Sequence, residues 1–467
     1  MRKMTLGQIC AIVGGSLRGN ASIVVSGIST DTRSIVPGDL FCAIVGERVD
    51  PHELVHDAMR AGAVACLVSS AVDVPSVITA PALELDPVII ALGRIARIQR
   101  EGRPNTNMIG ITGSSGKTTT KDIIGQVLGS HGPTFAPSGS PNNELGLPLT
   151  ILRAPETADY VVLEMGMRGL GHIAYLCGIA KPNVGVVTNV GKAHIGEVGS
   201  IEAIARAKAE LIDAIPATGF AILNNDDDFV RAMRFDTQAH VVTYGLREGS
   251  DVRGENIDVN VDGTTTFDLV HGNNRHVIHL PMLGKHNVSN ALAAAATGLC
   301  MGMSLMGIAE ALEHVVVTSK WRMETYEAKN DIMLINDAYN ANPESMSAAL
   351  HTLAGFPRTR GSWAVLGKMH ELGSESEAEH RKIGELVTEL KIDHLVGIGD
   401  SVAPMIQAAQ RAGHPHALLF SRFEVAAEYI STKAQREEII LFKASRSEGL
   451  EELAQMVAAR LNEGASK

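Results

Sequence analysis

The chain contains the stretch Gly110-Ile-Thr-Gly113-Ser-Ser-Gly116-Lys117-Thr118-Thr119-Thr120, which follows an apolar run and precedes an amphipathic helical pattern. Glycines let backbone N–H groups approach phosphate oxygens, and the N-terminus of the following helix adds a favourable dipole. Lys117 supplies a mobile positive charge, and the Thr118 hydroxyl can ligate Mg²⁺. The stretch therefore predicts a phosphate-binding loop whose ligand is a nucleoside triphosphate.

The spacing of this loop differs from the strict phosphate-loop pattern, which places glycine at position 111, where this chain has Ile111. The alternative interpretation is a glycine-rich strand-to-helix turn with an incidental Gly-Lys-Thr. A strand pattern before the loop and a helical pattern after it favour the phosphate loop. The apolar stripe of that helix consists of Ile123, Ile124, Val127 and Leu128.

Length and composition indicate an enzyme of about three domains. The 467 residues are 45% hydrophobic, which is enough to build a core in each domain. The formal net charge of -11 argues against a general nucleic-acid-binding surface. Local loops must therefore hold any polyanionic ligand, and we expect small-molecule partners and no nucleic acid.

The five cysteines lie far apart and form no close pair of the kind that builds zinc sites or redox motifs. We expect reduced, mostly buried thiols. The N-terminus lacks a sustained apolar signal segment, and no run approaches the ~20 apolar residues that span a bilayer. The sequence therefore predicts a cytoplasmic protein without a transmembrane segment, and we also expect a monomer.

Apolar runs divide the chain into three α/β blocks. A polar, turn-rich segment before the phosphate-loop strand gives the first boundary, and the second falls just before residue 320. We therefore expect an N-terminal domain over residues 1–102, a central domain over 103–318 and a C-terminal domain over 319–467.

The central and C-terminal blocks show strand-like runs separated by helical or polar sequence, which is typical of parallel sheets. Ligands of such doubly wound sheets collect beyond the carboxyl ends of the strands. Residues 251–281 alternate apolar and polar positions instead, and they predict a small antiparallel insert. The predicted strands of the chain are Ile23 to Ile28, Leu40 to Val45, Ala65 to Val68, Met108 to Thr112, Tyr160 to Glu164, Val184 to Val190, Phe220 to Leu223, Ile332 to Ile335, Trp363 to Leu366, His394 to Ile398 and Glu438 to Phe442.

Two polar residues follow predicted strands of the central block. Glu164 ends its strand, where a carboxylate can hold Mg²⁺, and the alternative is a solvated loop glutamate. His194 follows the run Val184 to Val190. A lone histidine at such a place is more often a hydrogen-bonded structural residue than a ligand.

Lys208 falls on the apolar stripe of the helix that starts after Ser200, so its side chain faces inward. A buried ammonium group is costly without a partner. Either its stem reaches to solvent, or the amine meets acidic groups or is covalently modified. Spacing alone favours the first of these interpretations.

Two segments carry candidate groups for ligand contact. Asn287 and Asn290 lie about one turn apart on the exposed face at the start of a helix, where amides can read a base or cap the helix. Arg446 lies between a strand and a helix. It could clamp a carboxylate or phosphate, or it could belong to a solvated basic turn.

The string Asp337-Ala-Tyr339-Asn340-Ala-Asn342-Pro343 follows another predicted strand. Asn342 and Pro343 make a good N-cap and first helical position. Helix capping leaves Asp337, Tyr339 and Asn340 unexplained, and they are therefore candidates for ligand contact.

Taken together, these motifs resemble the Mur ligases of peptidoglycan synthesis over essentially the whole chain, and within them the MurF branch. The Asn-Asn-Glu box and the Asp-Ala-Tyr-Asn-Ala-Asn-Pro string favour that branch. The motifs that carry the resemblance are Asp31-Thr-Arg33, Pro37-Gly-Asp-Leu-Phe41, Gly110 to Thr120, Asn142-Asn143-Glu144-Leu-Gly-Leu-Pro148, Glu164-Met-Gly166, Asn189 to His194, Ala207-Lys208, Gly284 to Asn290, Trp321-Arg322-Met-Glu324, Asp337 to Pro343 and Leu366-Gly367.

The resemblance implies a small UDP-sugar-binding α/β domain, a central parallel-sheet ATPase domain and a C-terminal Rossmann-like α/β domain. It implies ATP and two Mg²⁺ ions as cofactors. The lysine that matches Lys208 is carbamylated in Mur ligases, so the resemblance overturns the interpretation that its amine reaches solvent. The implied catalytic residues are Lys117, Glu164, His194 and Lys208, with Thr118, Glu164, His194 and Lys208 at the metal sites. The implied ATP-binding residues are Gly113, Ser114, Ser115, Gly116, Lys117, Thr118, Thr119, Asn287, Asn290, Arg322 and Asp337. The implied substrate-binding residues are Ser29, Thr32, Arg33, Asn142, Asn143, Glu144, Asn340 and Arg446.

The reaction that the resemblance implies joins UDP-N-acetylmuramoyl-tripeptide to D-alanyl-D-alanine. ATP phosphorylates the tripeptide carboxylate, and the amine of the dipeptide attacks the acyl phosphate. We expect domain closure to bring Arg322 and Asp337 to the ATP site. A Mur ligase with another acceptor, a folylpolyglutamate-synthase-like enzyme and a nucleotide-binding module without ligase activity remain alternatives. The chain departs from the family pattern at Pro51, Lys368, His370 and Ala444.

Overall fold

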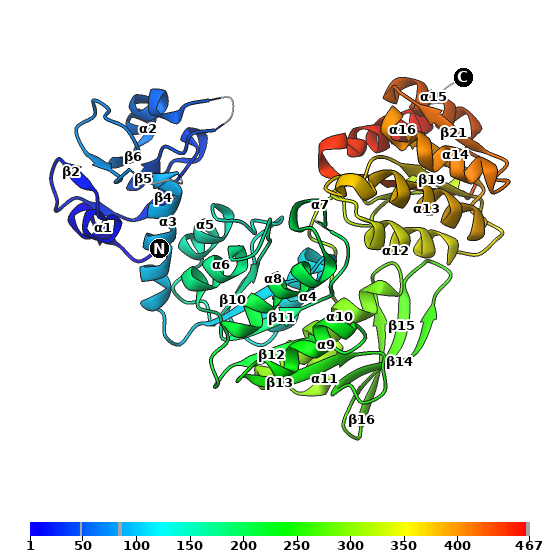
Figure 1. Ribbon diagram of the computed structural model, residues 1–467, viewed down its shortest axis with the longest axis horizontal. Helices are drawn as coiled ribbons and strands as arrows, with labels where there is room; N and C mark the ends of the chain where they lie inside the picture. Colours follow the sequence, from blue (N-terminus) through cyan, green and yellow to red (C-terminus); the bar gives the residue numbers. More distant parts are fainter. Residues whose placement is uncertain (47–48, 83–85, 194, 464–467) are drawn as a thin grey trace.

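The computed structural model describes residues 1–46, 49–82, 86–193 and 195–463. Three lobes follow one another in Figure 1, with the blue N-terminal lobe and the orange C-terminal lobe on either side of the central one. Each lobe contains one main β-sheet flanked by helices. The predicted α/β fold class is confirmed. Across the described residues, no helix has the length and apolar character that crossing a membrane requires.

The N-terminal lobe has a five-stranded sheet in the order β2-β7-β6-β5-β4, with a two-stranded sheet of β1 and β3 beside it. Within the five-stranded sheet, neighbouring strands run parallel except β2, which pairs antiparallel with β7. The elements are β1 Met4–Thr5, α1 Leu6–Val13, β2 Ser16–Arg18, β3 Val24–Val25, β4 Gly27–Ser29, β5 Asp39–Cys42, α2 Val55–Ala61, β6 Ala65–Val68 and β7 Val77–Thr79.

Helix α3 (Pro87–Glu101) joins the first two lobes. It starts at Asp86, whose carboxylate accepts hydrogen bonds from the N–H groups of Val88 and Ile89, and Pro87 occupies its first turn. The buried face of α3 belongs to one apolar core that includes helix α1 of the first lobe and helices of the second. The N-terminal sheet is therefore anchored on the central lobe through this helix (Figure 1).

The central lobe has a nine-stranded sheet in the order β16-β15-β14-β13-β12-β11-β8-β10-β9. Helices α5, α6 and α8 cover one face, and α4, α10 and α11 cover the other. The strands are β8 Asn107–Thr112, β9 Thr134–Phe135, β10 Tyr160–Glu164, β11 Val184–Val187, β12 Phe220–Asn224, β13 His240–Gly245, β14 Val252–Val259, β15 Thr265–His271 and β16 Asn274–Leu280. The helices are α4 Lys117–Gly129, α5 Gly146–Arg153, α6 His172–Ala180, α7 Ile195–Val198, α8 Ile201–Asp213, α9 Asp228–Ala232, α10 His286–Cys300 and α11 Leu305–Leu312.

Two sequence predictions for this sheet can be compared with the structure. The predicted antiparallel insert is confirmed, and it continues the parallel sheet because β14 pairs with β13. The predicted strand Val184 to Val190 is too long, since β11 ends at Val187. Thr188 N still donates to Thr112 O at the end of β8, but the side chains of Thr188 and Asn189 already form hydrogen bonds with Ser115 of the phosphate loop.

The C-terminal lobe has a six-stranded sheet in the order β17-β18-β22-β19-β20-β21, parallel except for β17. It confirms the predicted second doubly wound unit. Helix α12 begins with the predicted Asn342 cap, which forms a capping box with Ser345. The elements are β17 Glu324–Ala328, β18 Ile332–Asn336, α12 Pro343–Ala354, β19 Ser362–Leu366, α13 Ser376–Glu389, β20 His394–Ile398, α14 Ala403–Arg411, β21 Ala417–Phe420, α15 Phe423–Lys433, β22 Ile439–Lys443 and α16 Leu450–Glu463.

Candidate active site

The phosphate loop connects β8 to α4, and two of its glycines cannot be replaced without a clash. Gly113 has φ 151°, and a Cβ there would lie 1.8 Å from Thr188 Oγ1. Gly116 has φ 77° and caps α4, and a Cβ there would lie 2.7 Å from Asn290 Oδ1. Ile111, which departs from the strict pattern, is a fully buried core residue of β8. The loop therefore starts after position 111.

The segment that follows β11 braces this loop. Ser115 N donates to Asn189 Oδ1 over 2.9 Å, and Asn189 Nδ2 donates back to Ser115 Oγ over 3.0 Å. Ser114 Oγ donates to Gly191 O and accepts from Gly191 N. These reciprocal bonds hold the loop backbone in place before any ligand arrives.

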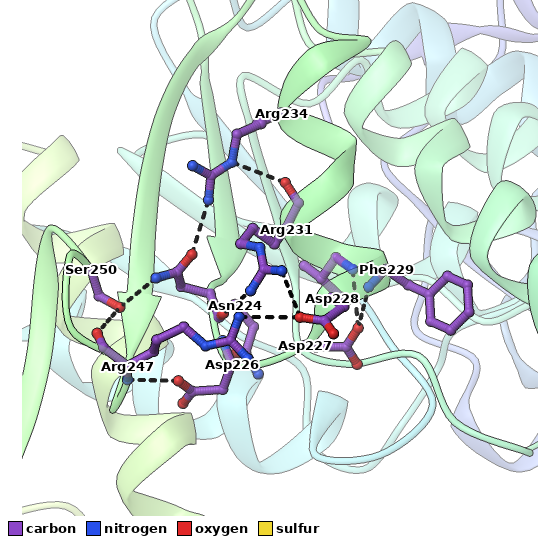
Figure 2. A network of polar contacts seen from close by, with 11 residues as sticks. Asn224, Asp226, Asp227, Asp228, Phe229, Arg231, Arg234, Arg247 and Ser250 are labelled. Carbon is purple, nitrogen blue, oxygen red and sulfur yellow. Dashed lines mark hydrogen bonds and ion pairs between the residues drawn. The ribbon is translucent and has the colours of Figure 1, made fainter.

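Figure 2 shows a network of polar contacts around Asn224, Asp226 and Asp227, and two of these residues also contact the segment after β11. Asn224 Nδ2 donates to Thr188 O over 2.7 Å. The Asp227 carboxylate accepts from Val190 N over 2.8 Å and also caps α9. Asp226 accepts from backbone N–H groups of the loop after β13. The residues at and just after the end of β12 therefore hold the segment that braces the phosphate loop.

Glu164 lies at the carboxyl end of β10, as predicted, and is 2% exposed. Its carboxylate accepts from Thr118 Oγ1 over 2.7 Å, Ser140 Oγ over 2.6 Å and Asn142 Nδ2 over 2.8 Å. Burial raises the pKa of Glu164, but the Lys117 charge and these donors outweigh it, so the pKa is lowered. The group is therefore an anion next to the first turn of α4.

Two lysines of this region differ in exposure, since Lys117 is half-buried and Lys208 is buried. Lys117 Nζ donates to Gly113 O over 2.7 Å, and burial lowers its pKa. Lys208 is 1% exposed, so its amine does not reach solvent, and the interpretation from spacing alone is wrong. Burial and then repulsion by Lys117 place the pKa of Lys208 well below its usual value. Such a pKa favours a neutral, nucleophilic amine.

The residues present suit a Mg²⁺ ion. Thr118 and Glu164 offer hard oxygen atoms 2.7 Å apart at the start of α4, where phosphate oxygens could complete an octahedral shell. The other predicted ligand, His194, lies outside the described residues. Within the described ranges, no cluster of three histidine, cysteine or acidic residues is arranged to hold a metal by itself.

Asn287 and Asn290 lie at the start of α10 as predicted, but the face that they occupy is buried rather than exposed. Asn290 accepts from Thr120 Oγ1 over 3.1 Å, and its amide donates to Asn287 Oδ1 over 2.8 Å. Helix α10 packs against α4, which explains the burial. Both amides still line the cavity beside the phosphate loop.

The C-terminal lobe supplies the opposite wall. Asp337 follows β18, and its carboxylate accepts from Lys443 Nζ over 2.6 Å. Lys443 also donates to Asn340 O over 2.9 Å and is 2% exposed. The Arg322 guanidinium lies over the Tyr339 ring, 4.1 Å from its centroid. Cations of one domain therefore face the phosphate loop of another.

These walls enclose a cavity of about 1070 Å³, at the upper end of the ~300–1,000 Å³ typical of a site for one small molecule. All three lobes contribute to it, since the start of α3 closes one end. The predicted site residues that line it are Ser114, Ser115, Gly116, Lys117, Thr118, Thr119, Asn142, Asn143, Glu144, Glu164, Asn287, Asn290, Arg322, Asp337 and Asn340.

The central and C-terminal lobes are in direct contact around this cavity. Lys192 Nζ pairs with Glu375 over 2.8 Å and with Glu379 over 2.9 Å. Lys192 N donates to Glu344 Oε1 over 2.7 Å. Asn342 Nδ2 donates to Ser114 O of the phosphate loop over 3.3 Å. The structure is thus a conformation in which the two lobes are docked.

Known proteins share this architecture. The Mur ligase family catalytic domain matches residues 24–101, the Mur ligase middle domain matches 111–298, and the Mur ligase glutamate ligase domain matches 321–446. This chain is a member of the Mur ligase family. It is 38% identical to the UDP-N-acetylmuramoyl-tripeptide–D-alanyl-D-alanine ligase of Mycobacterium bovis, over 98% of each chain.

Two solved structures agree with this assignment. MurF from Acinetobacter baumannii superposes with a TM-score of 0.89 at 31% identity, over 98% of this chain and 99% of that one. MurF ligase from Thermotoga maritima, crystallised in complex with ADP, superposes with a TM-score of 0.80 at 27% identity, over 94% and 99%. The MurF branch predicted from the motifs is confirmed.

Some predicted site residues of this Mur ligase do not line the cavity. Gly113 belongs to the phosphate loop itself and Lys208 to α8, and neither is among the residues that line the cavity. Arg446 pairs with Glu451, and its guanidinium lies over the Trp321 ring, 4.1 Å from the centroid. Its predicted role as a clamp for an anion stays a prediction.

The predicted UDP-sugar residues lie in the N-terminal lobe of the Mur ligase, at the carboxyl end of β4. Ser29 is buried, and its hydroxyl donates to Asp31 O over 2.8 Å. Arg33 is exposed and pairs with the Asp31 carboxylate over 2.7 Å. Thr32 begins the short 3-10 helix Thr32–Ser34. Their contact with substrate also stays a prediction.

Sequence reasoning missed several polar groups that line the cavity, among them His286, Glu371 and Lys443. Lys443 directly follows the predicted strand Glu438 to Phe442 and contacts Asp337, so the strand-end rule could have found it. His286 lies in the recognised Gly284 to Asn290 box, and burial lowers its pKa to about 4. Glu371 lies in a loop, where its own backbone φ is 64°, and no sequence signal indicated this residue.

Proposed function

We propose that this Mur ligase joins D-alanyl-D-alanine to the carboxylate of UDP-N-acetylmuramoyl-tripeptide at the expense of ATP. The relative from Mycobacterium bovis, which matches this chain over 98% of each sequence, is named after that activity. The observation that carries the proposal is the placement of Lys117 and Glu164 opposite Arg322 and Asp337 across one cavity. Cations and a metal-binding carboxylate there surround the space where a phosphoryl group would be transferred.

The nucleotide would lie with its phosphates on the phosphate loop. Ser114 to Thr119 would hold them, with Lys117 at the β- and γ-phosphates and Asn287 and Asn290 near the base. Asp337 would reach the ribose from the other lobe. The ADP complex of the Thermotoga maritima relative supports a nucleotide site in this fold.

Mg²⁺ would be held by Thr118 and Glu164, and His194 would serve a second ion. When bound, the ions would neutralise charge on the transferred phosphoryl group. Lys208 would carry a carbamate, formed when its neutral amine attacks CO₂ and releases a proton. Its burial and lowered pKa support this modification, because only the neutral amine is nucleophilic.

The other substrates would approach from the two remaining sides of the cavity. The N-terminal lobe would hold the UDP-sugar through Ser29, Thr32 and Arg33. The tripeptide would pass along Asn142, Asn143 and Glu144, toward the phosphate loop. The dipeptide would enter from the C-terminal lobe, where Asn340 and Arg446 are the predicted contacts.

The residues of the chain would act by positioning and charge. A carboxylate is a poor electrophile until it is phosphorylated, so its oxygen must attack the γ-phosphorus in line, and the bond from that phosphorus to the bridging oxygen breaks to release ADP. Lys117 and Arg322 would stabilise the charge on the transferred group from opposite sides. The dipeptide amine would then attack the acyl carbon, and the C–O bond would break to release phosphate. The docked lobes would keep water from the acyl phosphate.

We further propose that the partners are small molecules, with no nucleic acid, and that the protein works as a cytoplasmic monomer. The formal charge of -11 supports the first part, because a chain with a net negative charge is repelled by nucleic acid. Size-exclusion chromatography with light scattering would test the second part. A mass near twice the 49.5 kDa of one chain would contradict a monomer.

Phosphate release tests the proposed activity. Purified protein, ATP, Mg²⁺ and UDP-N-acetylmuramoyl-tripeptide are combined with D-alanyl-D-alanine, with single amino acids or with no acceptor. We expect release with the dipeptide alone, and a product heavier by the dipeptide less water. Release with a single amino acid instead would move the chain to another acceptor class. No release with any acceptor would contradict ligase activity.

A further inference from the structure

Arg322 lies in a backbone turn that needs support from its surroundings. Its neighbours Trp321 and Met323 adopt left-handed conformations with φ of 59° and 52°, which residues other than glycine rarely adopt. Tyr339 N donates to Trp321 O over 3.0 Å, and Met323 N donates to Asp337 Oδ1 over 3.2 Å. Strain of this kind persists where surrounding contacts over-determine it, and it clusters at functional sites.

The Arg322 guanidinium, which this turn presents, has only part of its hydrogen-bonding capacity satisfied. It lies over the face of the Tyr339 ring at 4.1 Å, and its buried Nε has no hydrogen-bond partner among the residues that the structure describes. Arg322 and the phosphate loop line the same cavity, so the guanidinium shares one site with the residues that would hold phosphate.

A second stack supports the turn from behind. The Arg446 guanidinium lies over the Trp321 ring at 4.1 Å, and it is anchored by an ion pair with Glu451. Trp321 is joined to Tyr339 by the backbone hydrogen bond already described. The two arginine-over-aromatic pairs are thus linked in series, and the Arg322–Tyr339 pair is the one at the cavity.

We propose that Tyr339 is the positioning residue that aims Arg322 at the phosphates of the nucleotide, with Trp321 and Arg446 fixing the turn behind it. A cation over an aromatic face is attracted by the ring quadrupole. A guanidinium held in this way still presents its N–H edges to phosphate oxygens. The inference rests on the proposed function, because it places the phosphates between Arg322 and the phosphate loop.

Nucleotide affinity tests the proposal without relying on turnover. The Kd for ATP is measured by calorimetry on the full chain and on two variants of the same position. Tyr339→Phe keeps the aromatic face and should bind ATP within about twofold of the unaltered chain, whereas Tyr339→Leu removes the face and should weaken binding about tenfold. Equal weakening in both variants, or none in Tyr339→Leu, would overturn the proposal.

A matched control separates positioning from loss of packing. Tyr326 is half-buried on β17 of the same sheet, and its hydroxyl contacts Asn336. Tyr326→Leu removes a similar ring and should leave the Kd for ATP unchanged. If Tyr326→Leu weakens ATP binding as much as Tyr339→Leu does, the effect comes from the fold of the lobe, and the proposal is overturned.

Fluorinated phenylalanines at position 339 provide a second series that keeps the shape of the ring. Each added fluorine reduces the negative charge on the ring face, so the logarithm of the Kd for ATP should rise stepwise with fluorine number. A flat series would overturn the proposal even if the leucine variant did not fold.

Steady-state kinetics then distinguish this proposal from the proposed function. Tyr339→Leu should raise the KM for ATP and leave the KM for the dipeptide unchanged. If the unaltered protein releases no phosphate with any acceptor, the ligase proposal fails, and the Kd series still tests Tyr339. If turnover is normal but the Kd series is flat, the Tyr339 proposal alone fails.

Discussion

The two walls of the cavity are held together by different means. The phosphate-loop wall depends on backbone hydrogen bonds and on glycines with no space for a side chain, such as Gly113. The C-terminal wall depends on side-chain pairs, Lys443 with Asp337 and Arg322 with Tyr339. The first wall lies within one lobe, and the second belongs to another. The comparison teaches that one half of the site is preformed, while the other arrives by docking of a lobe.

The largest effect should come from the preformed wall. Lys117→Met removes the cation that faces the transferred phosphoryl group, and kcat/KM should fall at least about 100-fold. The measurement is phosphate release under the conditions of the proposed function. Arg436→Gln, at an exposed ion pair with Asp331, is the control and should leave activity unchanged. A Lys117 variant with full activity would break the comparison.

Behind the same wall, Lys208→Ala should reduce turnover by roughly 50-fold or more, because no carbamate can then support the metal site. Adding a short-chain carboxylic acid should restore part of the activity, since it can occupy the space of the missing carbamate. The rescue is measured as phosphate release against acid concentration. A fully active Lys208→Ala would remove the carbamate from the account.

Lobe docking should have a smaller effect. Lys192→Ala removes both interlobe ion pairs, and kcat/KM should fall about tenfold. Opposite charges at Glu375 and Glu379 raise the pKa of Lys192, so the pair stays charged through the neutral range. Raising the salt concentration should bring the unaltered protein closer to the variant.

Lys382 offers a control, because it pairs with Glu379 within the C-terminal lobe. Lys382→Ala should behave like the unaltered protein. Equal losses in both variants would mean that the charge on Glu379, and not contact between the lobes, is what matters.

A substitution in the segment that supports the phosphate loop should have a smaller effect still. Asp227→Asn weakens the carboxylate that accepts from Val190 N, and the KM for ATP should rise roughly three- to fivefold. Asp228 is its neighbour, but it is exposed and pairs with Arg231 and Arg247. Asp228→Asn should leave the KM unchanged, and a KM that rises equally in both variants would contradict the role given to Asp227.

The smallest effect concerns pH. His286 is half-buried in the cavity wall, and desolvation lowers its pKa from the usual 6.5 to about 4, so the unfolded chain binds more protons between these values. Stability should therefore be complete above about pH 6.5 and fall as the pH drops toward 4. His286→Gln should show a flatter decline in Tm between pH 7 and pH 5. An identical decline would show that other groups control acid stability.

The sequence predicted the preformed wall better than the docked one. Gly113 to Thr118 form one contiguous motif, and Glu164 follows a strand whose partner register could be expected, so both were found. Lys443 and Asp337 are 106 positions apart, and their contact depends on the strand order of the sheet. The burial of Asn290 was missed because the packing of α10 on α4 is a tertiary fact with no local signal.

The prediction of individual strands succeeded and failed for similar reasons. The apolar strands Met108 to Thr112, Tyr160 to Glu164 and Trp363 to Leu366 were predicted within one residue, whereas Leu40 to Val45 was too long because β5 ends at Cys42, and Ile23 to Ile28 is divided between β3 and β4. β13 and β17 were missed, since the first carries partly exposed residues and the second is an edge strand with charged positions. Val184 to Val190 was extended too far because Thr188 is a good strand former, yet it serves the phosphate loop.

Isotope transfer tests the central claim most directly, namely that the cavity uses ATP to activate the tripeptide carboxylate. UDP-N-acetylmuramoyl-tripeptide labelled with ¹⁸O in both oxygens of that carboxylate is turned over with ATP and D-alanyl-D-alanine. Mass spectrometry should find one ¹⁸O atom in the released phosphate and the other in the new amide. Released phosphate without ¹⁸O would contradict an acyl phosphate, and with it the account of how the two walls act together.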